Sequence, residues 1–266
     1  MSKLLQPLVK KRLKSLSGKN DNGFILWEGI SEIDGVTPVV CIVTGIKKAS
    51  ANGKTGDLMQ TWILMRDVNP AQAVRERKEK GVCGDCVHRP QEDGKRSCYV
   101  NMRTPGSVWR SYQSGNYARL DQQYWHLLGH IREAGIRFGA YGDPGAVPVN
   151  VWQALQAIAK FTTGYTHTWR YRPADYANVT MASCETMADL RHAESLGYKA
   201  FLVVEAGQAK DTIGAGMARC PSDPSLVGVH VPCSQCQGCS GSTSRRHRVI
   251  EVHGATAHMY QPLRMA

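Results

Sequence analysis

The sequence predicts an α/β fold, a complete or partial parallel β/α barrel preceded by a small antiparallel β element. The first observation behind this prediction is the alternation of helix and strand patterns, with short connections, over residues 120–206. Neighbouring parallel strands need crossover connections of this kind. The second is the length of 266 residues, about what an eight-stranded barrel requires. We expect three regions: a basic N-terminal arm over 1–22, a small β element with a helix over 23–80, and a barrel-like metal-binding domain over 81–266.

The small β element is predicted from three short runs rich in β-branched and aromatic residues. They read FILWEGI, VTPVVCIVTGI and LMQTWILMRDV, and Gly, Asp and Asn turns separate them, as in an antiparallel meander. Cys41 lies in the second run and is most simply a buried small hydrophobe. The next segment predicts a helix over 69–80, because Asn69 is a good N-cap, Pro70 suits the first helical position and Gly81 is a stop signal.

The barrel-like region begins with a cysteine-rich loop over 82–98. Residues 120–135 then predict a helix, since apolar residues such as Tyr124, Leu127 and Ile131 recur at three- and four-residue spacing. The remaining patterns predict helices over 149–164 and 185–197, and strands over 136–143, 165–171, 177–184, 199–206, 228–233 and 247–254.

Charge and hydropathy restrict the compartment and the partners. No run approaches the roughly 20 apolar residues that cross a bilayer, and the N-terminal residues do not form a signal peptide. We therefore expect a cytoplasmic protein without membrane contact. The net charge is +11, and six of the cations lie in the first twenty residues without any acid. This arm could contact nucleic acid or be a solvated terminus. The residues predicted for nucleic-acid contact are Lys10, Lys11, Arg12, Arg245 and Arg246.

Cysteine usage is the strongest chemical signal, since eight of the nine cysteines lie between 83 and 239. A reducing cytosol disfavours disulfides, so such clustering indicates metal ligation or catalysis. The first group is Cys83, Cys86 and Cys98; the second is Cys220, Cys233, Cys236 and Cys239, with Pro221 after Cys220. In each group a C-x-x-C turn lets two thiolates chelate one site, and thiolates favour zinc or an iron–sulfur cluster.

The spacing within each group predicts what it binds. The second group, C-x-x-C-x-x-C with a more distant Cys-Pro, resembles the ligand run of a [4Fe–4S] cluster, with zinc as the alternative. The first group, C-x-x-C-x11-C, leaves two possibilities open. Three thiolates could hold a second cluster with one iron open to chemistry, or Cys184 or His88 could complete a closed zinc site.

Several predicted strands end in polar or reactive residues, and barrel active sites form at the carboxyl ends of the strands. Asp143, His167 and His253 are therefore the candidate catalytic residues. Asp143 precedes a proline and could instead cap a turn. His167 and Arg170 point to opposite faces if the strand continues to Tyr171, so only one can easily enter a barrel.

The order of these features over residues 80–256 resembles radical-SAM-like barrel proteins of phages and mobile elements. The shared order is a cysteine group, strands ending in GDP, YTHTWR and MASC, then CP, CSQCQGC and a strand ending in HG. The resemblance implies that the first cysteine group holds a [4Fe–4S] cluster that binds S-adenosylmethionine and yields a 5′-deoxyadenosyl radical. It implies that Gly142 and Asp143 contact the cofactor's amino group and that the second group holds an auxiliary cluster. The family usually shows C-x-x-x-C-x-x-C, from which the first group departs.

Two functions follow as hypotheses. The first is an iron–sulfur, radical-SAM-like barrel enzyme acting on an unidentified small-molecule or nucleic-acid substrate. The second is a zinc- or cluster-stabilised nucleic-acid-binding protein of a phage or mobile element, serving replication or regulation. Strand-end residues beside two cysteine groups favour the first, and the basic arm with the Arg245–Arg246 pair favours the second.

Overall fold

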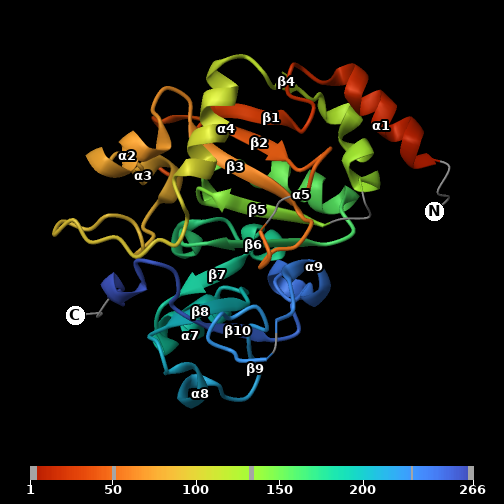
Figure 1. Ribbon diagram of the computed structural model, residues 1–266. Helices are drawn as coiled ribbons and strands as arrows, with labels where there is room; N and C mark the ends of the chain where they lie inside the picture. Colours follow the sequence, from red (N-terminus) through yellow and green to blue (C-terminus); the bar gives the residue numbers. More distant parts are fainter. Residues whose placement is uncertain (1–4, 50–51, 132–134, 229, 263–266) are drawn as a thin grey trace.

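The computed structural model describes residues 5–49, 52–131, 135–228 and 230–262. In these residues ten strands form one sheet in the order β4-β1-β2-β3-β5-β6-β7-β8-β10-β9. Figure 1 shows this sheet running from β1 at the top to β9 at the bottom. The predicted α/β class is confirmed. Strands β4 and β9 stand at the two ends of the strand order, so the described sheet is open and does not close into a barrel.

The first part of the sheet is the expected antiparallel meander. Its strands are β1 (Gly23–Ile30), β2 (Pro38–Thr44) and β3 (Met59–Met65), with the short β4 (Ala118–Arg119) parallel to β1. Strand β2 is buried along most of its length, and Cys41 is one of its fully buried residues, as predicted. Strand β3 pairs in parallel with β5 (Ile136–Tyr141), so the meander continues directly into the parallel strands.

The second part of the sheet is parallel throughout. Beyond β5 it contains β6 (Thr162–Thr166), β7 (Met181–Cys184), β8 (Ala200–Val204), β10 (His247–Glu251) and β9 (Met217–Arg219). The connections carry α5 (Val149–Ile158), α6 (Tyr176–Val179), α7 (Met187–Ser195) and α8 (Ala209–Thr212). A connection with a helix between parallel neighbours is the expected crossover arrangement.

Alternate residues of these strands face two different environments. Ala182, Leu202 and Val249 belong to the main hydrophobic core, which also contains the buried residues of α5, α6 and α7. Phe201, Val203 and Ile250 belong to a smaller cluster that contains Cys220 and Cys239. The helices therefore cover one face of the sheet, and the second cysteine group lies over the other.

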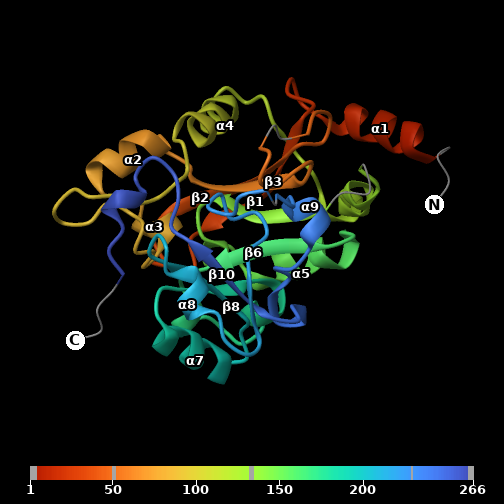
Figure 2. The same cartoon turned by 60° about the horizontal axis from the view of Figure 1, so that its bottom comes forward.

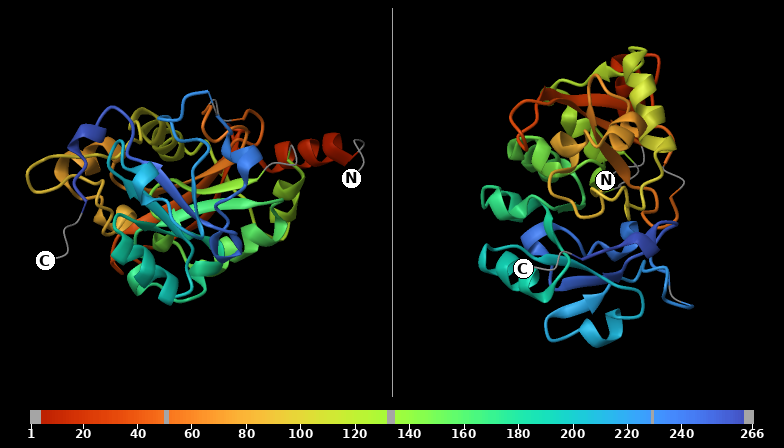
Figure 3. Two further views of the ribbon diagram at one scale, coloured as in Figure 1. Left: turned by 90° about the horizontal axis from the view of Figure 1, so that it is seen from below. Right: turned by 90° about the vertical axis from the view of Figure 1, so that its left-hand side faces the viewer.

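The cysteine-rich segments lie against distant parts of the chain. The first follows α2 (Pro70–Glu76) and α3 (Lys80–Cys83), and the C-terminal segment with η5 (Ala257–Met259) contacts its loop, where Tyr260 stacks on His88; Figure 2 shows the same region from another side. There, Thr256 Oγ1 donates to Cys98 O at 3.4 Å. The second contains α9 (Cys233–Cys236) and η4 (Gly241–Thr243); Cys233 N donates to Lys54 O at 2.9 Å. Figure 3 shows the meander in one half of the molecule and these blue C-terminal segments in the other half, next to it.

Several predicted elements differ from those observed. Residues 120–135 contain a 3₁₀ helix, η1 (Gln122–His130), rather than an α-helix, and the predicted strand over 165–171 ends at Thr166 and is followed by η3 (Trp169–Tyr171). The predicted strand over 177–184 begins as α6 and only its second half is β7. The described residues of 228–233 contain no strand, whereas β9 was not predicted. The predicted helix over 69–80 is divided at Arg77, which adopts the left-handed conformation after α2.

The N-terminal arm is a packed helix. Helix α1 (Leu5–Leu16) buries Val9 and Leu13, one turn apart, while Lys10, Lys11 and Arg12 stay exposed. Arg12 Nη2 donates to Tyr124 OH of η1 at 3.2 Å, which fixes the helix against the body. Within the described ranges, none of the helices combines the length and the apolar character that crossing a membrane requires. Helix α4 (Arg103–Gln113) completes the N-terminal half.

Candidate metal and catalytic site

A cavity of about 110 Å³ lies on the face of the parallel strands that the helices leave uncovered. Its walls include residues from five parallel strands: Arg137, Tyr165, Ser183, Phe201, Val203 and Ile250. All four cysteines of the second group line this cavity, as do His88, His167 and His253. A volume of this size holds several water molecules or a small ligand. The cavity therefore joins most of the residues that the sequence predicts for chemistry.

The second cysteine group is held by backbone hydrogen bonds to two strands of the sheet and to the loop between β2 and β3. Cys220 N donates to Val249 O of β10 at 2.7 Å, and Cys233 N donates to Lys54 O. Gly164 N of β6 donates to Cys239 O at 3.3 Å. Burial raises the pKa of Cys239 to about 12 and also raises the pKa values of Cys220 and Cys233; the proximity of other thiols of the group adds to each of the three shifts. All four cysteines therefore border one cavity, and their shared ligation of a metal stays a prediction.

Three cations line the cavity next to these thiols. Arg137 is 7% exposed and its Nη2 donates to Tyr99 OH at 2.7 Å. Arg248 Nε donates to Gly238 O at 3.3 Å, and Lys54 Nζ lies 2.8 Å from His253 Nε2. Among the described residues, none of the three cations has a carboxylate within 4.0 Å. Arg137 is the buried one of the three, and a buried cation without a carboxylate partner is stabilised by another source of negative charge.

The first cysteine group lies at the carboxyl ends of β5 and β6. Cys83 is the last residue of α3, and Cys86 N donates to Cys83 O at 3.2 Å. Cys98 N donates to His88 O at 3.0 Å, which folds the loop back on itself. Burial is the main reason that the pKa of Cys83 is raised well above its usual value, and the nearby Cys86 and Cys98 raise it further. The three cysteines thus influence one another and lie near Asp143 and His167, and their ligation of a metal stays a prediction.

Asp143 is a structural hub at the end of β5. Its Oδ1 accepts from Gly145 N at 2.8 Å and from Thr166 Oγ1 at 2.7 Å, and its Oδ2 accepts from His167 N at 2.6 Å. It is the N-cap of η2 (Pro144–Ala146), the role that the Asp-Pro pair suggests. Gly142 has φ +82°, and a Cβ there would meet Ile63 O at 2.5 Å. Both residues shape the turn, and the oxygens of Asp143 are engaged by donors of the chain itself.

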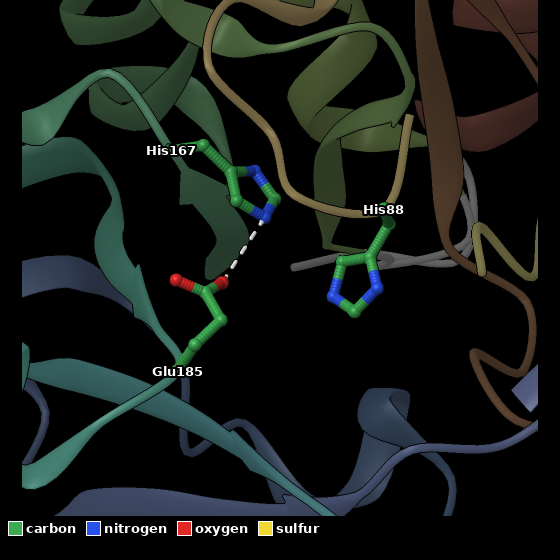
Figure 4. A group of neighbouring side chains, drawn as sticks. All are labelled: His88, His167 and Glu185. Carbon is green, nitrogen blue, oxygen red and sulfur yellow. Dashed lines mark ion pairs between the residues drawn. The ribbon is translucent and has the colours of Figure 1, made fainter. Parts of the chain in front are cut away.

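His167, His88 and Glu185 form a compact group on the other side of Asp143, and Figure 4 shows their side chains pointing toward one another. One ligand atom from each lies within 4.8 Å of the other two. His167 Nε2 is 3.8 Å from Glu185 Oε1, and their side chains are 19% and 2% exposed. Burial opposes the charged form of His167, but Cys86, Asp143 and Glu185 together raise its pKa well above the usual value. Burial also raises the pKa of Glu185 to about 7 and lowers that of His88 to about 3.

The remaining predicted residues lie elsewhere. His253 borders the cavity, where it stacks on Tyr99 with ring centroids 5.2 Å apart, and it is close enough to His88 to help lower the pKa of that imidazole. Cys184 is fully buried in the helix-covered core, because alternation along β7 turns it away from the cavity that Ser183 lines. The structure therefore does not bring Cys184 to either cysteine group. Arg245 and Arg246 are exposed before β10.

Sequence reasoning missed Glu185 as a site residue. It directly follows the last residue of β7, in the same relation to its strand as His167 to β6. The rule that selected the other strand-end residues therefore also selects Glu185. The predicted strand ended at Cys184, the residue before Glu185, so Cys184 was chosen as the candidate and Glu185 was not.

Comparison of the chain with protein-family models, curated proteins and solved structures finds no match. The assignment of this site therefore rests on the chemistry and geometry of its own residues.

Proposed function

We propose that this chain is an iron–sulfur protein whose second cysteine group, Cys220, Cys233, Cys236 and Cys239, holds a [4Fe–4S] cluster at one wall of a reaction cavity. The observation that carries the proposal is the convergence of four cysteines on a cavity that also presents three cations without carboxylate partners. A cluster bound by four thiolates is anionic, so Lys54, Arg137 and Arg248 would balance its charge. The open parallel half of the sheet would then be a partial barrel around the cluster and its substrate.

The spacing of the thiols favours a cluster over zinc. Four sulfurs around a tetrahedral zinc lie about 3.8 Å apart, given a Zn–S bond of about 2.3 Å. Within the described part of the chain, the only three cysteine, histidine or carboxylate ligand atoms found within 4.8 Å of one another belong to His88, His167 and Glu185. No three cysteine sulfurs of the described chain meet this limit, so the cysteines do not form a preformed tetrahedral zinc site, and the C-x-x-C-x-x-C spacing in the sequence is what favours a cluster.

A cluster closed by four cysteines supplies one-electron transfer when it is bound. The chain's own residues would set its properties: the amides of α9 and Gly238 lie close to it, and the cations stabilise its reduced form. The substrate would occupy the remaining cavity between this group and His167. Cluster binding by Cys83, Cys86 and Cys98 stays a prediction. So does S-adenosylmethionine binding, for which Asp143 would have to release the hydrogen bonds it now accepts.

The test is anaerobic purification followed by absorption spectroscopy and by iron and acid-labile sulfide analysis. We expect a brown protein with broad absorbance near 400 nm, on the order of four irons for a cubane bound by four cysteines. Cys236→Ser should lose this absorbance, since it removes one cavity-facing ligand. Cys184→Ala is the matched control and should keep it, because Cys184 is buried on the opposite face.

A colourless wild-type protein with stoichiometric zinc would contradict the proposal. So would a cluster that survives in Cys236→Ser but disappears in Cys86→Ser, because the iron would then belong to the first group. A cluster lost in both variants but kept in Cys184→Ala would indicate that the two groups depend on each other, and iron counts on each variant would assign the ligands.

A further inference from the structure

We infer that His88, His167 and Glu185 form a mononuclear site for a divalent transition metal, distinct from the second cysteine group and adjacent to Cys86 of the first. Two imidazoles and one carboxylate are a ligand set that binds catalytic Zn²⁺ and non-haem Fe²⁺. The inference does not rest on the proposed cluster, because none of its three ligands is a cysteine.

The distances suit a single ion. The three ligand atoms lie within 4.8 Å of one another, and His167 Nε2 is 3.8 Å from Glu185 Oε1. Metal bonds of about 2.1 Å in tetrahedral geometry place two ligand atoms about 3.4 Å apart. The His167–Glu185 distance would therefore shorten by about 0.4 Å, and the distances to His88 by at most about 1.4 Å, to complete the coordination.

Two of the ligand atoms need a partner that the described chain does not provide. Glu185 Oε1 and His167 Nε2 are both buried and neither makes a hydrogen bond. Their separation of 3.8 Å is too long for a hydrogen bond between them. Leaving a buried carboxylate oxygen unsatisfied costs about 1–3 kcal/mol or more. A metal ion would satisfy both atoms at once.

The outer shell is also that of a metal site. Ligating histidines usually give their second ring nitrogen to a carboxylate or another polar group. Here His88 Nδ1 lies 2.9 Å from Ser97 Oγ, which leaves Nε2 free for the ion. His167 Nδ1 lies 3.7 Å from Asp143 Oδ2, and Asp143 is itself fixed by the donors of its turn. Ser97 thus orients the His88 ring, and the hydrogen bond from His167 N to Asp143 Oδ2 holds the backbone of the second ligand in place.

The site opens toward the cavity. His88 and His167 both line it, so an ion held by three protein ligands would keep an open position for water or substrate. Such an ion lowers the pKa of a bound water and polarises a carbonyl or phosphoryl oxygen. This arrangement assigns the carboxyl end of β6 and β7 a Lewis-acid role, opposite the wall formed by the second cysteine group.

The experiment is titration of the full chain with Co²⁺, followed by its visible d–d absorption, and with Zn²⁺ in competition with a chelating dye. Cys236→Ser is titrated in parallel, so that loss of a cluster and loss of this site are separate readouts. We expect one ion that produces no thiolate-to-cobalt charge-transfer band and persists in Cys236→Ser. Glu185→Gln and His88→Gln should lose it. Glu205→Gln and His126→Gln should retain it, because Glu205 follows β8 as Glu185 follows β7 but is exposed, and His126 is also exposed.

Ser97→Ala should weaken binding by about 10- to 100-fold, as outer-shell changes do, without removing a ligand. It keeps the inference testable where Glu185→Gln fails to fold, which circular dichroism would reveal. Unchanged Co²⁺ and Zn²⁺ binding in Glu185→Gln, or binding that is lost only in Cys86→Ser, would overturn the inference. So would the absence of this ion from folded wild type, which would leave His167 and Glu185 as a buried ion pair.

Discussion

Buried charged residues of this chain fall into two kinds. Asp143 and Asp223 have their oxygens engaged by donors of the chain itself, and they hold turns in place. Arg137 lines the cavity without a carboxylate partner, and Glu185, beside the cavity-lining His167, has a buried oxygen that accepts no hydrogen bond. A buried charge costs free energy unless it is paired, so the first kind stabilises the fold and the second marks the site.

Asp223 shows what the first kind contributes. Its Oδ1 accepts from Ser225 Oγ at 2.7 Å, and its Oδ2 accepts from Arg219 Nε and from Glu251 N, each at 3.1 Å. Burial would raise its pKa, but these donors outweigh burial and lower it. Asp223→Asn should therefore reduce the free energy of unfolding by about 3 kcal/mol near neutral pH, as for a broken buried pair.

The pH dependence follows from the sign of that shift. A carboxyl whose pKa is lowered by folding stabilises the protein above its unfolded pKa of about 4, and this contribution is lost as pH falls through the folded value. Urea unfolding at a series of pH values should give free energies of unfolding for wild type and Asp223→Asn whose difference is complete above about pH 4 and disappears below it. The exposed Asp57→Asn is the control. A difference that stays constant down to strongly acidic pH would show that the carboxylate charge is not involved.

Secondary structure was predictable where local pattern and tertiary environment agree. The predicted elements around β5, α5, α7 and β8 are present because burial on the sheet reinforces their apolar runs. The predicted strand over 165–171 is wrong beyond Thr166. Asp143, which is distant in sequence, accepts a hydrogen bond from His167 N, and the chain turns there. Strand β9 is three residues long and its pairing with β10 defines it, so its own sequence carries little signal. The strand-end rule could also have selected Glu185, but its grouping with His88 depends on how the loop after α3 folds onto the strand ends.

Helix α1 allows a test at the scale of one element. Leu13 is 2% exposed and Leu8 is 63% exposed, on opposite sides of the same helix. Leu13→Ala should lower the free energy of unfolding by about 2 kcal/mol, since it empties a packed position. Leu8→Ala should change it by less than about 0.5 kcal/mol. Equal effects in denaturant titrations of the two variants would mean that α1 does not pack on the body.

At the scale of the whole molecule, one cavity links segments that are far apart in the sequence. The loop that contains Lys54, the segment from Cys220 to Cys239 and strand β6 meet at the second cysteine group. His88 and His167 border the same cavity at the carboxyl ends of the strands, beside Glu185. An electron-transfer centre and a Lewis-acid centre would thus face one substrate from two sides. This arrangement is possible because the sheet is open and its helices cover only one face. The cysteine segment lies over the other face and borders the cavity there.

The last prediction concerns the stability that a bound cluster gives to this assembly. Ligand binding that requires the folded site contributes directly to folding free energy. Each 1 kcal/mol should raise the thermal midpoint of a chain of this size by about 2–4 °C. Cluster-loaded wild type should therefore unfold several degrees above the same protein stripped of iron, and Cys236→Ser should match the stripped form. Scanning calorimetry under anaerobic conditions measures this difference, with Cys184→Ala as the control that still gains stability on reconstitution. Identical midpoints with and without iron would mean that the second cysteine group does not join these segments through a cluster.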